Sequence, residues 1–245
     1  MSKLHRYEYL LSVLPTLEPI GSIPPLSKQN FLGQVIESNG PVSTVETLLL
    51  SDDLTQYQAL LAEEIEQDRI DLAILSLDKT EDESVLPDFL LPKETTEEQQ
   101  EQECIRLSVD GIWERYFHHA ASVAKRTGSN FLKAWVGFEV GLRNALATAR
   151  AQMLELESEA YLVAPELADK KTDYHHIVSE WSGASNPLNA LRFLDEARWS
   201  WFEEHGGWYN FHACEIEVYA AKLILLHRWR RILSEKKQRN EASLT

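Results

Sequence analysis

The chain has 245 residues and a net charge of −15, and its hydrophobic fraction of 44% is ordinary for a globular protein. A chain of this length can bury a large core, which disfavours a wholly disordered protein. Two cysteines are too few for a disulfide framework, and the N-terminal apolar run is too short for a signal peptide, so we expect a cytoplasmic protein.

Most of the negative charge lies in one segment. Residues 52–103 contain seventeen acidic and three basic residues, a net charge of −14, and the rest of the chain is nearly neutral. Such a segment repels phosphate backbones, so nucleic acid is not expected as a partner. The segment is either a solvated acidic face or a docking surface for a basic partner.

The C-terminal end of the chain is basic. It predicts either a frayed, soluble helix end or a contact with lipid headgroups or an acidic protein. Its basic residues are Arg228, Arg230, Arg231, Lys236, Lys237 and Arg239.

The N-terminal part of the chain predicts a short apolar element and a capped helix. Tyr7–Leu17 fits either a short strand or the first turns of a helix, and a proline-rich connector follows at 19–25. Ser27 is a suitable cap for a helix that carries Phe31, Leu32, Val35 and Ile36 on one side.

The next segment predicts more helix. Ser43 and Glu46 fit a capping box, and Ser51 or Asp52 can restart the helix that follows. Asp71–Leu77 fits one further short helix, followed by an acidic loop at 78–84.

Two long amphipathic helices are predicted in the middle of the chain. Thr95 and Glu98 form a second capping-box pattern, and apolar residues then recur every three or four positions up to about Arg126. Gly128 ends that helix, and Ser129 or Asn130 begins another that extends to about Met153. We expect the two to pack as an antiparallel hairpin.

Three more helical segments lead to the last helix of the chain. Two short ones are expected near 155–163 and 173–181, and Asn186 with Pro187 predicts a capped helix that ends near Glu204. The final helix, Asn210–Leu233, is apolar on nearly every side, which predicts a buried central helix. Glu217 and Lys222 interrupt its apolar run, so it is not expected to span a membrane.

These patterns predict an all-α, multi-helix bundle, because no segment alternates convincingly like a strand. We expect one domain over 1–245, with a proline-rich N-terminal connector. An acidic, loop-rich region is expected at about 66–103 and a frayed basic tail at about 234–245.

No pattern in the sequence predicts a catalytic or metal site. The adjacent pairs His118–His119 and His175–His176 cannot each grip one ion, because neighbouring residues of a helix point in different directions. His212 and Cys214 are isolated. Glu139 and Arg143 are expected to form a salt bridge on a helix face, with Asn144 and Arg150 as nearby polar groups. We therefore expect no catalytic residue, no metal and no cofactor.

Several groups of residues together resemble one bacterial family. They are Tyr7–Leu17, Phe131–Trp135 with Glu139, Leu142–Ala147, Arg150 and Ala151, Asn186–Leu188 leading to Arg198–Trp201, and Ala220–Leu223 with Arg228 and Trp229. The family is formally of unknown function and is typically found with the proteins of V-type ATPases. It looks like a short relative of the C-type central-stalk protein of those ATPases. Residues 50–103 carry no such resemblance.

The resemblance implies a helical protein without an active site. It would couple the rotating central shaft of the ATPase to the membrane rotor ring, for proton or sodium transport, and would reach the inner membrane only through the complex. The C-type central-stalk protein is longer and has three similar helical units. It therefore stays open whether this chain replaces that protein, assists assembly of the complex or occupies another position in the stalk. The alternatives are a helical metal-dependent enzyme or small-ligand hydrolase that uses His118, His119, His175 or His176, and a free-standing helical scaffold.

Overall fold

A computed structural model describes residues 7–77, 85–91, 109–207 and 210–242. These residues form α-helices and short 3-10 helices, and they include no strand, which confirms the all-α prediction for this part of the chain. The α-helices are α1 (Glu8–Val13), α2 (Lys28–Glu37), α3 (Val42–Leu61), α5 (Val109–Thr127), α6 (Asn130–Met153), α7 (His175–Ser182), α8 (Pro187–His205) and α9 (Ala213–Ala242). The 3-10 helices are η2 (Gln67–Arg69), η3 (Asp88–Leu90), η5 (Ser158–Tyr161) and η6 (Pro165–Leu167).

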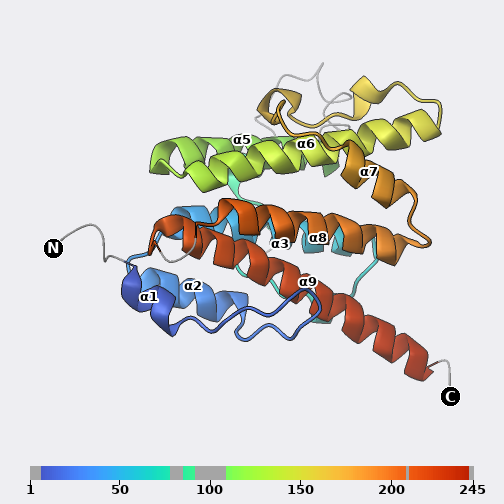
Figure 1. The fold of residues 1–245 in the computed structure, drawn as a ribbon. Helices are drawn as coiled ribbons and strands as arrows, with labels where there is room; N and C mark the ends of the chain where they lie inside the picture. The colour runs from blue at the N-terminus through green and yellow to red at the C-terminus, as the bar shows by residue number, and fades with distance from the viewer. Residues whose placement is uncertain (1–6, 78–84, 92–108, 208–209, 243–245) are drawn as a thin grey trace.

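The helices lie in three layers (Figure 1). The antiparallel pair α5 and α6 forms the upper layer, α3, α8 and α9 lie beneath it, and α1 and α2 lie at the bottom. Helix α3 packs on both α9 and α5, and therefore links the layers. The hairpin expected for the two middle helices is present, and its turn is Gly128, whose positive φ of 72° suits a glycine.

Three predicted helix caps are confirmed. The Ser27 hydroxyl accepts a hydrogen bond from the Asn30 amide at 3.1 Å, and the Ser129 hydroxyl accepts one from the Leu132 amide at 2.9 Å. Asn186 caps α8 with Pro187 at its first position. Each cap satisfies an amide that the first turn of a helix leaves without a partner.

The predicted start of α3 is wrong. The helix begins at Val42, after Pro41, and has no side-chain cap, so Ser43 lies inside the helix. The helix also runs unbroken to Leu61, without a restart at Ser51 or Asp52. Asp52 does not act as a cap because its carboxylate binds Lys28 and Arg231, which lie on other helices.

The helix predicted for Asp71–Leu77 is absent. The Asp53 carboxylate of α3 accepts hydrogen bonds from the amides of Ala73, Ile74 and Leu75 at 2.6–3.0 Å. These amides therefore already have an acceptor, and the segment is irregular, with bends at 73–74 and 77, instead of helical. The acidic loop at 78–84 and the capping box at Thr95 lie outside the described residues, and α5 is described only from Val109.

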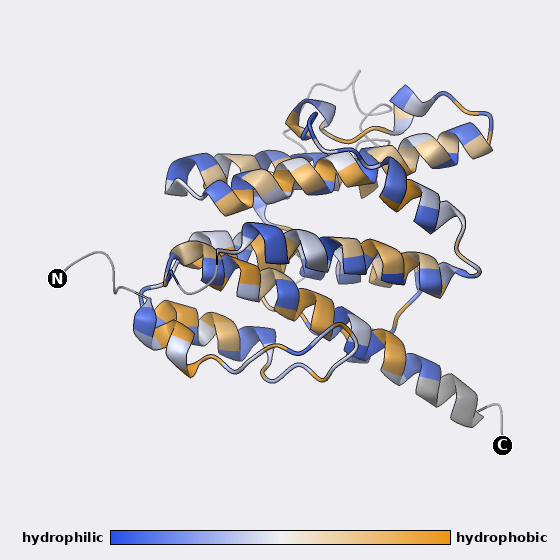
Figure 2. Cartoon of the chain, viewed as in Figure 1, coloured by the Kyte–Doolittle hydropathy of each residue, from blue (hydrophilic) through white to orange (hydrophobic). Residues whose placement is uncertain are grey.

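Helix α9 is the central helix that the sequence predicts. Ile216, Leu223 and Leu226 are fully buried, and Trp229 is 3% exposed. Figure 2 shows the apolar residues of α9 concentrated where it crosses the bundle. The helix continues to Ala242, so the part of the expected frayed tail that is described, residues 234–242, continues α9; that its end frays stays a prediction. No helix in the described residues is long and apolar enough to span a membrane.

The shorter elements follow the sequence only approximately. The segment at Tyr7–Leu17 forms the short helix α1 and not a strand. The segment near 155–163 contains only the 3-10 helix η5, while the one near 173–181 contains α7.

Candidate functional site

A buried carboxylate on α8 joins three basic or polar side chains. Asp195 is fully buried and accepts hydrogen bonds from Arg198 at 2.9 Å, Arg228 at 3.0 Å and the Trp229 indole at 3.0 Å. Arg228 and Trp229 are neighbours on α9, so Asp195 ties α8 to the central helix. We call Asp195, Arg198, Glu139, Arg228 and Trp229 the Asp195 network.

Arg198 extends this network to the upper layer. Its guanidinium donates two hydrogen bonds to the Glu139 carboxylate on α6, at 2.7 and 2.8 Å, in a bidentate arrangement. Burial by itself would raise the pKa of Glu139, but the positive charge and hydrogen bonds of Arg198 outweigh burial and lower it. Glu139 is therefore ionised at neutral pH.

The predicted pair of Glu139 with Arg143 is wrong. Glu139 binds Arg198, and the Arg143 guanidinium instead lies over the Trp113 ring, 4.2 Å from its centroid. A bidentate partner on another helix has displaced the i,i+4 partner, because the planar guanidinium of Arg198 matches the carboxylate geometry. Nearby, Asn144 exchanges hydrogen bonds with the Val163 backbone and so has a structural role.

A second buried network joins α2, α3 and α9. The Lys28 ammonium lies 2.7 Å from Asp52 and 3.5 Å from Asp53, and all three side chains are fully buried. Arg231 of α9 donates to Asp52 at 2.8 Å. Burial would raise the pKa of Asp52, but the charges of Arg231 and Lys28 together lower it to about 2. We call Lys28, Asp52, Asp53, Arg231 and Asp71 the Lys28 network.

Asp71 closes the Lys28 network at the surface. A hydrogen bond with His227, followed by one from Gln29 and by the charge of Lys28, lowers the pKa of the Asp71 carboxyl against the effect of burial. Lys28 also donates to the Asp71 backbone carbonyl. His227 Nε2 donates to the Leu26 carbonyl at 2.9 Å, so the same histidine fastens the proline-rich connector to α9.

These contacts correct two expectations about charge. Asp52 and Asp53 belong to the acidic segment but are buried and paired, so they are part of neither a solvated face nor a docking surface. Arg228 and Arg231 belong to the basic end but bind Asp195 and Asp52 inside the bundle. Exposed acidic side chains of the segment do remain after α3, at Glu63, Glu64, Glu66 and Asp68.

A cleft of about 660 Å³ lies between α3, α5, α6, α8 and α9, beside both networks. We call it the arginine cleft, because five arginines line it: Arg143, Arg150, Arg198, Arg228 and Arg231. Its wall also includes two tryptophans, Trp113 and Trp135, and three carboxylates, Asp110, Glu139 and Glu235.

A larger cleft of about 870 Å³ lies where α3, α6 and α9 begin. Glu217 is 2% exposed there and accepts a hydrogen bond from the Ser129 hydroxyl at 2.9 Å, and burial raises its pKa. Burial also raises the pKa of the Cys214 thiol, as do the charges of Glu215 and Glu217. A thiol with a raised pKa is a poor nucleophile at neutral pH, so this cleft does not activate Cys214.

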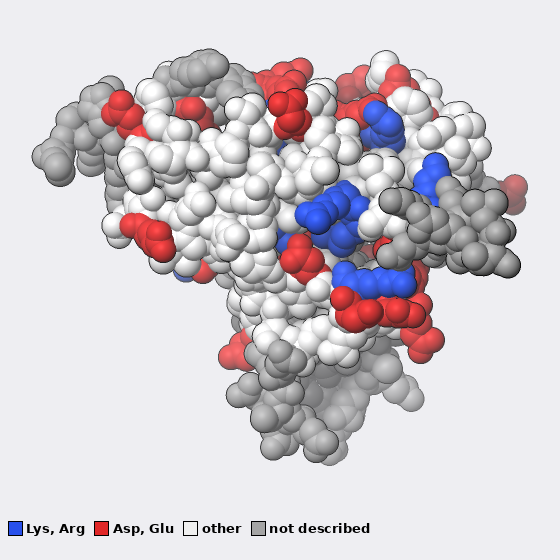
Figure 3. Space-filling model, turned by 90° about the horizontal axis from the view of Figure 1, so that it is seen from below, with Lys and Arg blue, Asp and Glu red and all other residues white. Residues whose placement is uncertain are grey.

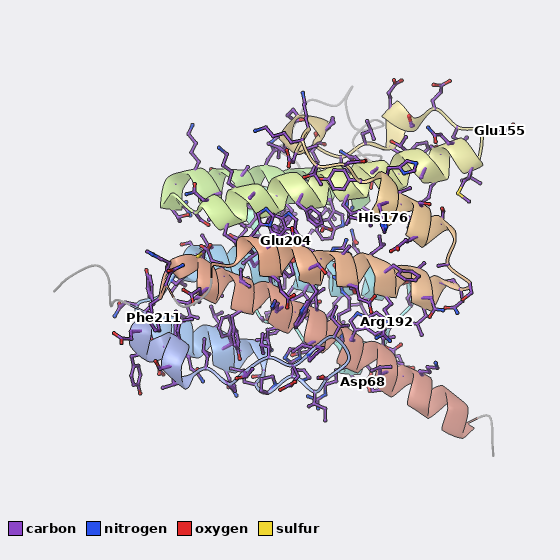
Figure 4. The ribbon with its side chains drawn as sticks, viewed as in Figure 1. Asp68, Glu155, His176, Arg192, Glu204 and Phe211 are labelled. Atoms are coloured by element: carbon purple, nitrogen blue, oxygen red, sulfur yellow. The ribbon has the colours of Figure 1, made fainter. Side chains whose placement is uncertain are left out.

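The histidines named as alternative metal ligands have other neighbours. His118 lies 3.1 Å from Glu166, and His119 stacks on Phe89 with the ring centroids 3.8 Å apart. His176, on α7 in Figure 4, lies 3.7 Å from Glu180 of the same helix, and His175 begins that helix. Among the residues that the structure describes, no three His, Cys, Asp or Glu side chains could together hold a metal ion.

Sequence reasoning missed the two residues at the centres of these networks, Asp195 and Lys28. The only signal for Asp195 is a carboxylate beside Leu194 in the apolar stripe of α8, and Lys28 gives none beyond its position after a helix cap. Lys28 lies 24 residues from Asp52, and Asp195 lies 33 residues from Arg228 and 34 from Trp229, although only three from Arg198.

Comparison with known proteins gives one match. A family model described as "Protein of unknown function (DUF2764)" matches residues 48–241, which run from α3 through nearly all of α9. A search of curated proteins found no match. A search of solved structures found none either.

Proposed function

This chain belongs to the DUF2764 family, and we propose that it is a non-catalytic subunit of a V-type ATPase. In this proposal it couples the central stalk to the membrane rotor ring during proton or sodium transport. It contacts the shaft and ring proteins at the cytoplasmic side of the inner membrane and reaches the membrane only through the complex. It carries no cofactor and performs no chemical step.

One observation supports the proposal. The residues that carry the resemblance to the family typically found with V-type ATPases contact one another in the folded chain. Arg198 binds Glu139, and Trp201 packs against Phe131 with the ring centroids 5.8 Å apart. Lys222 lies over the Trp199 ring at 4.6 Å. These contacts join α6, α8 and α9, although the motifs lie far apart in the sequence.

The chemistry of these contacts favours a structural role. Glu139, Arg198 and Arg228 are paired with one another or with Asp195, so their charges are already compensated within the fold. A catalytic acid or base needs a free proton position facing a substrate. Motif residues that instead bind one another make a rigid body, which is what a coupling protein requires.

The direct test is affinity purification of the tagged chain from gently solubilised membranes. The proposal predicts that the catalytic and shaft proteins of the ATPase are recovered with it. A tagged Leu223→Asp variant, in which the fully buried core of α9 is disrupted, should recover none of them. Recovery of the wild-type chain alone would contradict the proposal.

A second test asks whether the exposed part of the acidic segment docks a basic partner. Glu64 and Asp68 are exposed, and Asp68 lies at the lower side of the bundle in Figure 4. On the face that Figure 3 shows, acidic side chains flank a small group of basic ones, and most of the surface is uncharged. Asp71 is unsuitable for this test because it stabilises the Lys28 network.

Replacing both Glu64 and Asp68 by lysine should weaken the complex and flatten its dependence on salt. The matched control replaces Glu157 and Glu159 by lysine; these are also exposed but lie near η5 in the upper part of the bundle. Both variants change the net charge equally. If they assemble equally well, the segment is a solvated face and not a docking surface.

A further inference from the structure

The arginine cleft gathers arginine side chains in a protein that is strongly acidic. The whole chain carries a net charge of −15, yet five of its Lys and Arg residues line this one cleft. Arginines in the wall of a cleft are the usual means by which proteins bind phosphate groups, because a guanidinium presents five N–H donors in one plane.

Three of the five arginines hold carboxylates and so belong to the fold. Arg198 uses its Nε, Nη1 and Nη2 groups for Glu139 and Asp195. Arg231 uses both terminal nitrogens for Asp52, while Arg228 uses only Nη1 for Asp195. The carboxylates of Glu139, Asp195 and Asp52 compensate the charges of these three arginines, and Arg228 keeps unused N–H donors.

The other two arginines differ. Within the described residues, Arg143 and Arg150 have no carboxylate within 4.0 Å; they lie over the rings of Trp113 and Trp181, at 4.2 and 5.1 Å. Stacking on a ring uses the face of the guanidinium and leaves the N–H donors in its plane available. Burial lowers the pKa of the Arg143 guanidinium, and the nearby charges of Glu139 and Asp110 act in the opposite direction.

Trp113 provides an independent sign that an acceptor is missing. Its indole nitrogen is buried and has no hydrogen-bond partner among the residues that the structure describes. A buried donor without an acceptor costs about 1–3 kcal/mol. Trp113 lies in the wall of the cleft, beneath Arg143, so this wall holds an indole donor without an acceptor next to an arginine without a carboxylate within 4.0 Å.

The spacing of Arg143 and Arg150 indicates the size of the ligand. The two residues are seven positions apart on α6, which is about two turns or 10 Å along the helix axis. They therefore lie on the same side of the helix. A chain of two or three phosphates offers oxygens along its length to two donors placed one after the other in this way.

We propose that the arginine cleft binds an anion with a polyphosphate chain, such as pyrophosphate or a nucleoside di- or triphosphate. Arg143 and Arg150 donate to its phosphate oxygens, and Arg228 adds the N–H donors that Asp195 leaves unused. This inference is independent of the ATPase role, because it rests on the cleft alone.

The experiment is isothermal titration calorimetry of the full chain with pyrophosphate, ADP and ATP, with citrate as a carboxylate comparison. The decisive variants are Arg143→Gln and Arg150→Gln, each of which should weaken polyphosphate binding about tenfold or more, since a charge-assisted hydrogen bond contributes roughly that factor. Binding should also weaken as salt rises.

The matched control is Arg192→Gln, which removes the same charge outside the cleft. Arg192 is exposed on α8 and pairs with Glu196 of the same helix (Figure 4). Its loss should leave binding unchanged. Arg150 is exposed, so its variant should fold normally even if Arg143→Gln is less stable, and thermal unfolding of each variant checks this.

The outcomes separate clearly. Equal binding of pyrophosphate and the nucleotides supports recognition of the phosphates alone, and tighter binding of the nucleotides supports an added contact with the base. No binding of any of the three, or equal weakening by Arg150→Gln and Arg192→Gln, would overturn the proposal. Citrate binding as tightly as pyrophosphate would overturn the preference for phosphate.

Discussion

Removal of the Asp195 side chain should destabilise the protein far more than removal of a neighbouring surface carboxylate. Asp195 is fully buried and accepts hydrogen bonds from Arg198, Arg228 and Trp229. In an Asp195→Ala variant, Arg198 keeps its two bonds to Glu139. Arg228 and the Trp229 indole lose the acceptor that the structure gives them.

The magnitude follows from these two losses. Breaking a buried ion pair by removing one partner costs about 3–5 kcal/mol, because the remaining charge is left uncompensated. Arg228 is 21% exposed and can recover some hydration, which places the expected loss near the lower end of that range. Asp195→Asn should cost less, because its carbonyl oxygen can still accept hydrogen bonds from both arginines.

The control is Glu196→Ala, one residue further along α8. Glu196 pairs with Arg192 at 2.7 Å, but both side chains are about half exposed. Such a pair on a helix surface contributes only about 0.3–0.5 kcal/mol. The two substitutions therefore remove one carboxylate each from adjacent positions and differ mainly in burial.

The assay is urea unfolding followed by tryptophan fluorescence, with the free energy of unfolding taken from the midpoint and a common slope. We expect Asp195→Ala to unfold at a clearly lower urea concentration than Glu196→Ala. A loss below about 1 kcal/mol for Asp195→Ala, or equal losses for both variants, would refute the reasoning that the Asp195 network holds α8 on α9.

Acid stability, two further buried positions and the metal content can also be tested on the purified chain. The pKa of Asp52 is about 2 in the folded chain against 3.8 ordinarily, so roughly 2 kcal/mol of stability should be present above pH 4 and lost as pH falls toward 2; urea midpoints of wild type and Asp52→Asn measured against pH test this. Burial raises the pKa of Glu217, so ionisation opposes folding as pH rises through that pKa; Glu217→Gln should raise the thermal unfolding temperature at pH 7, and a lower one would contradict this. Leu223→Ala should cost about 2–5 kcal/mol in urea and Leu223→Asp should unfold the chain, whereas a stable Leu223→Asp variant would show that the core is misplaced. Elemental analysis of the purified chain should find no stoichiometric iron, manganese or zinc, and finding one would revive the enzyme hypothesis based on His118, His119, His175 and His176.

The features of the fold that depend on neighbouring residues could be predicted from the sequence. Ser27 and Asn186 are recognisable as caps because a cap binds an amide three residues away. Gly128 is recognisable as a helix end because its position requires a positive φ. The burial of Leu223 and Trp229 follows from apolar residues on every side of one helix.

Most of the candidate site could not be predicted in this way. Arg228 and Arg231 stand out in the sequence only as the basic end of a helix, because nothing near them shows a carboxylate partner. Their partners are Asp195 and Asp52, 33 and 179 residues away. The prediction for Asp71–Leu77 failed for the same reason, since the acceptor for its amides is Asp53 on α3.

Local sequence therefore sets the helices, several of their ends and the buried central helix, because these depend on hydrogen bonds and apolar spacing within a few residues. Which charges are paired depends instead on tertiary packing. An ion pair forms where two helices cross, and the crossing of α8 and α9 alone places Asp195 beside Arg228. The same crossings leave Arg143 and Arg150 without a carboxylate partner among the described residues, and this is why the arginine cleft is visible only in the folded chain.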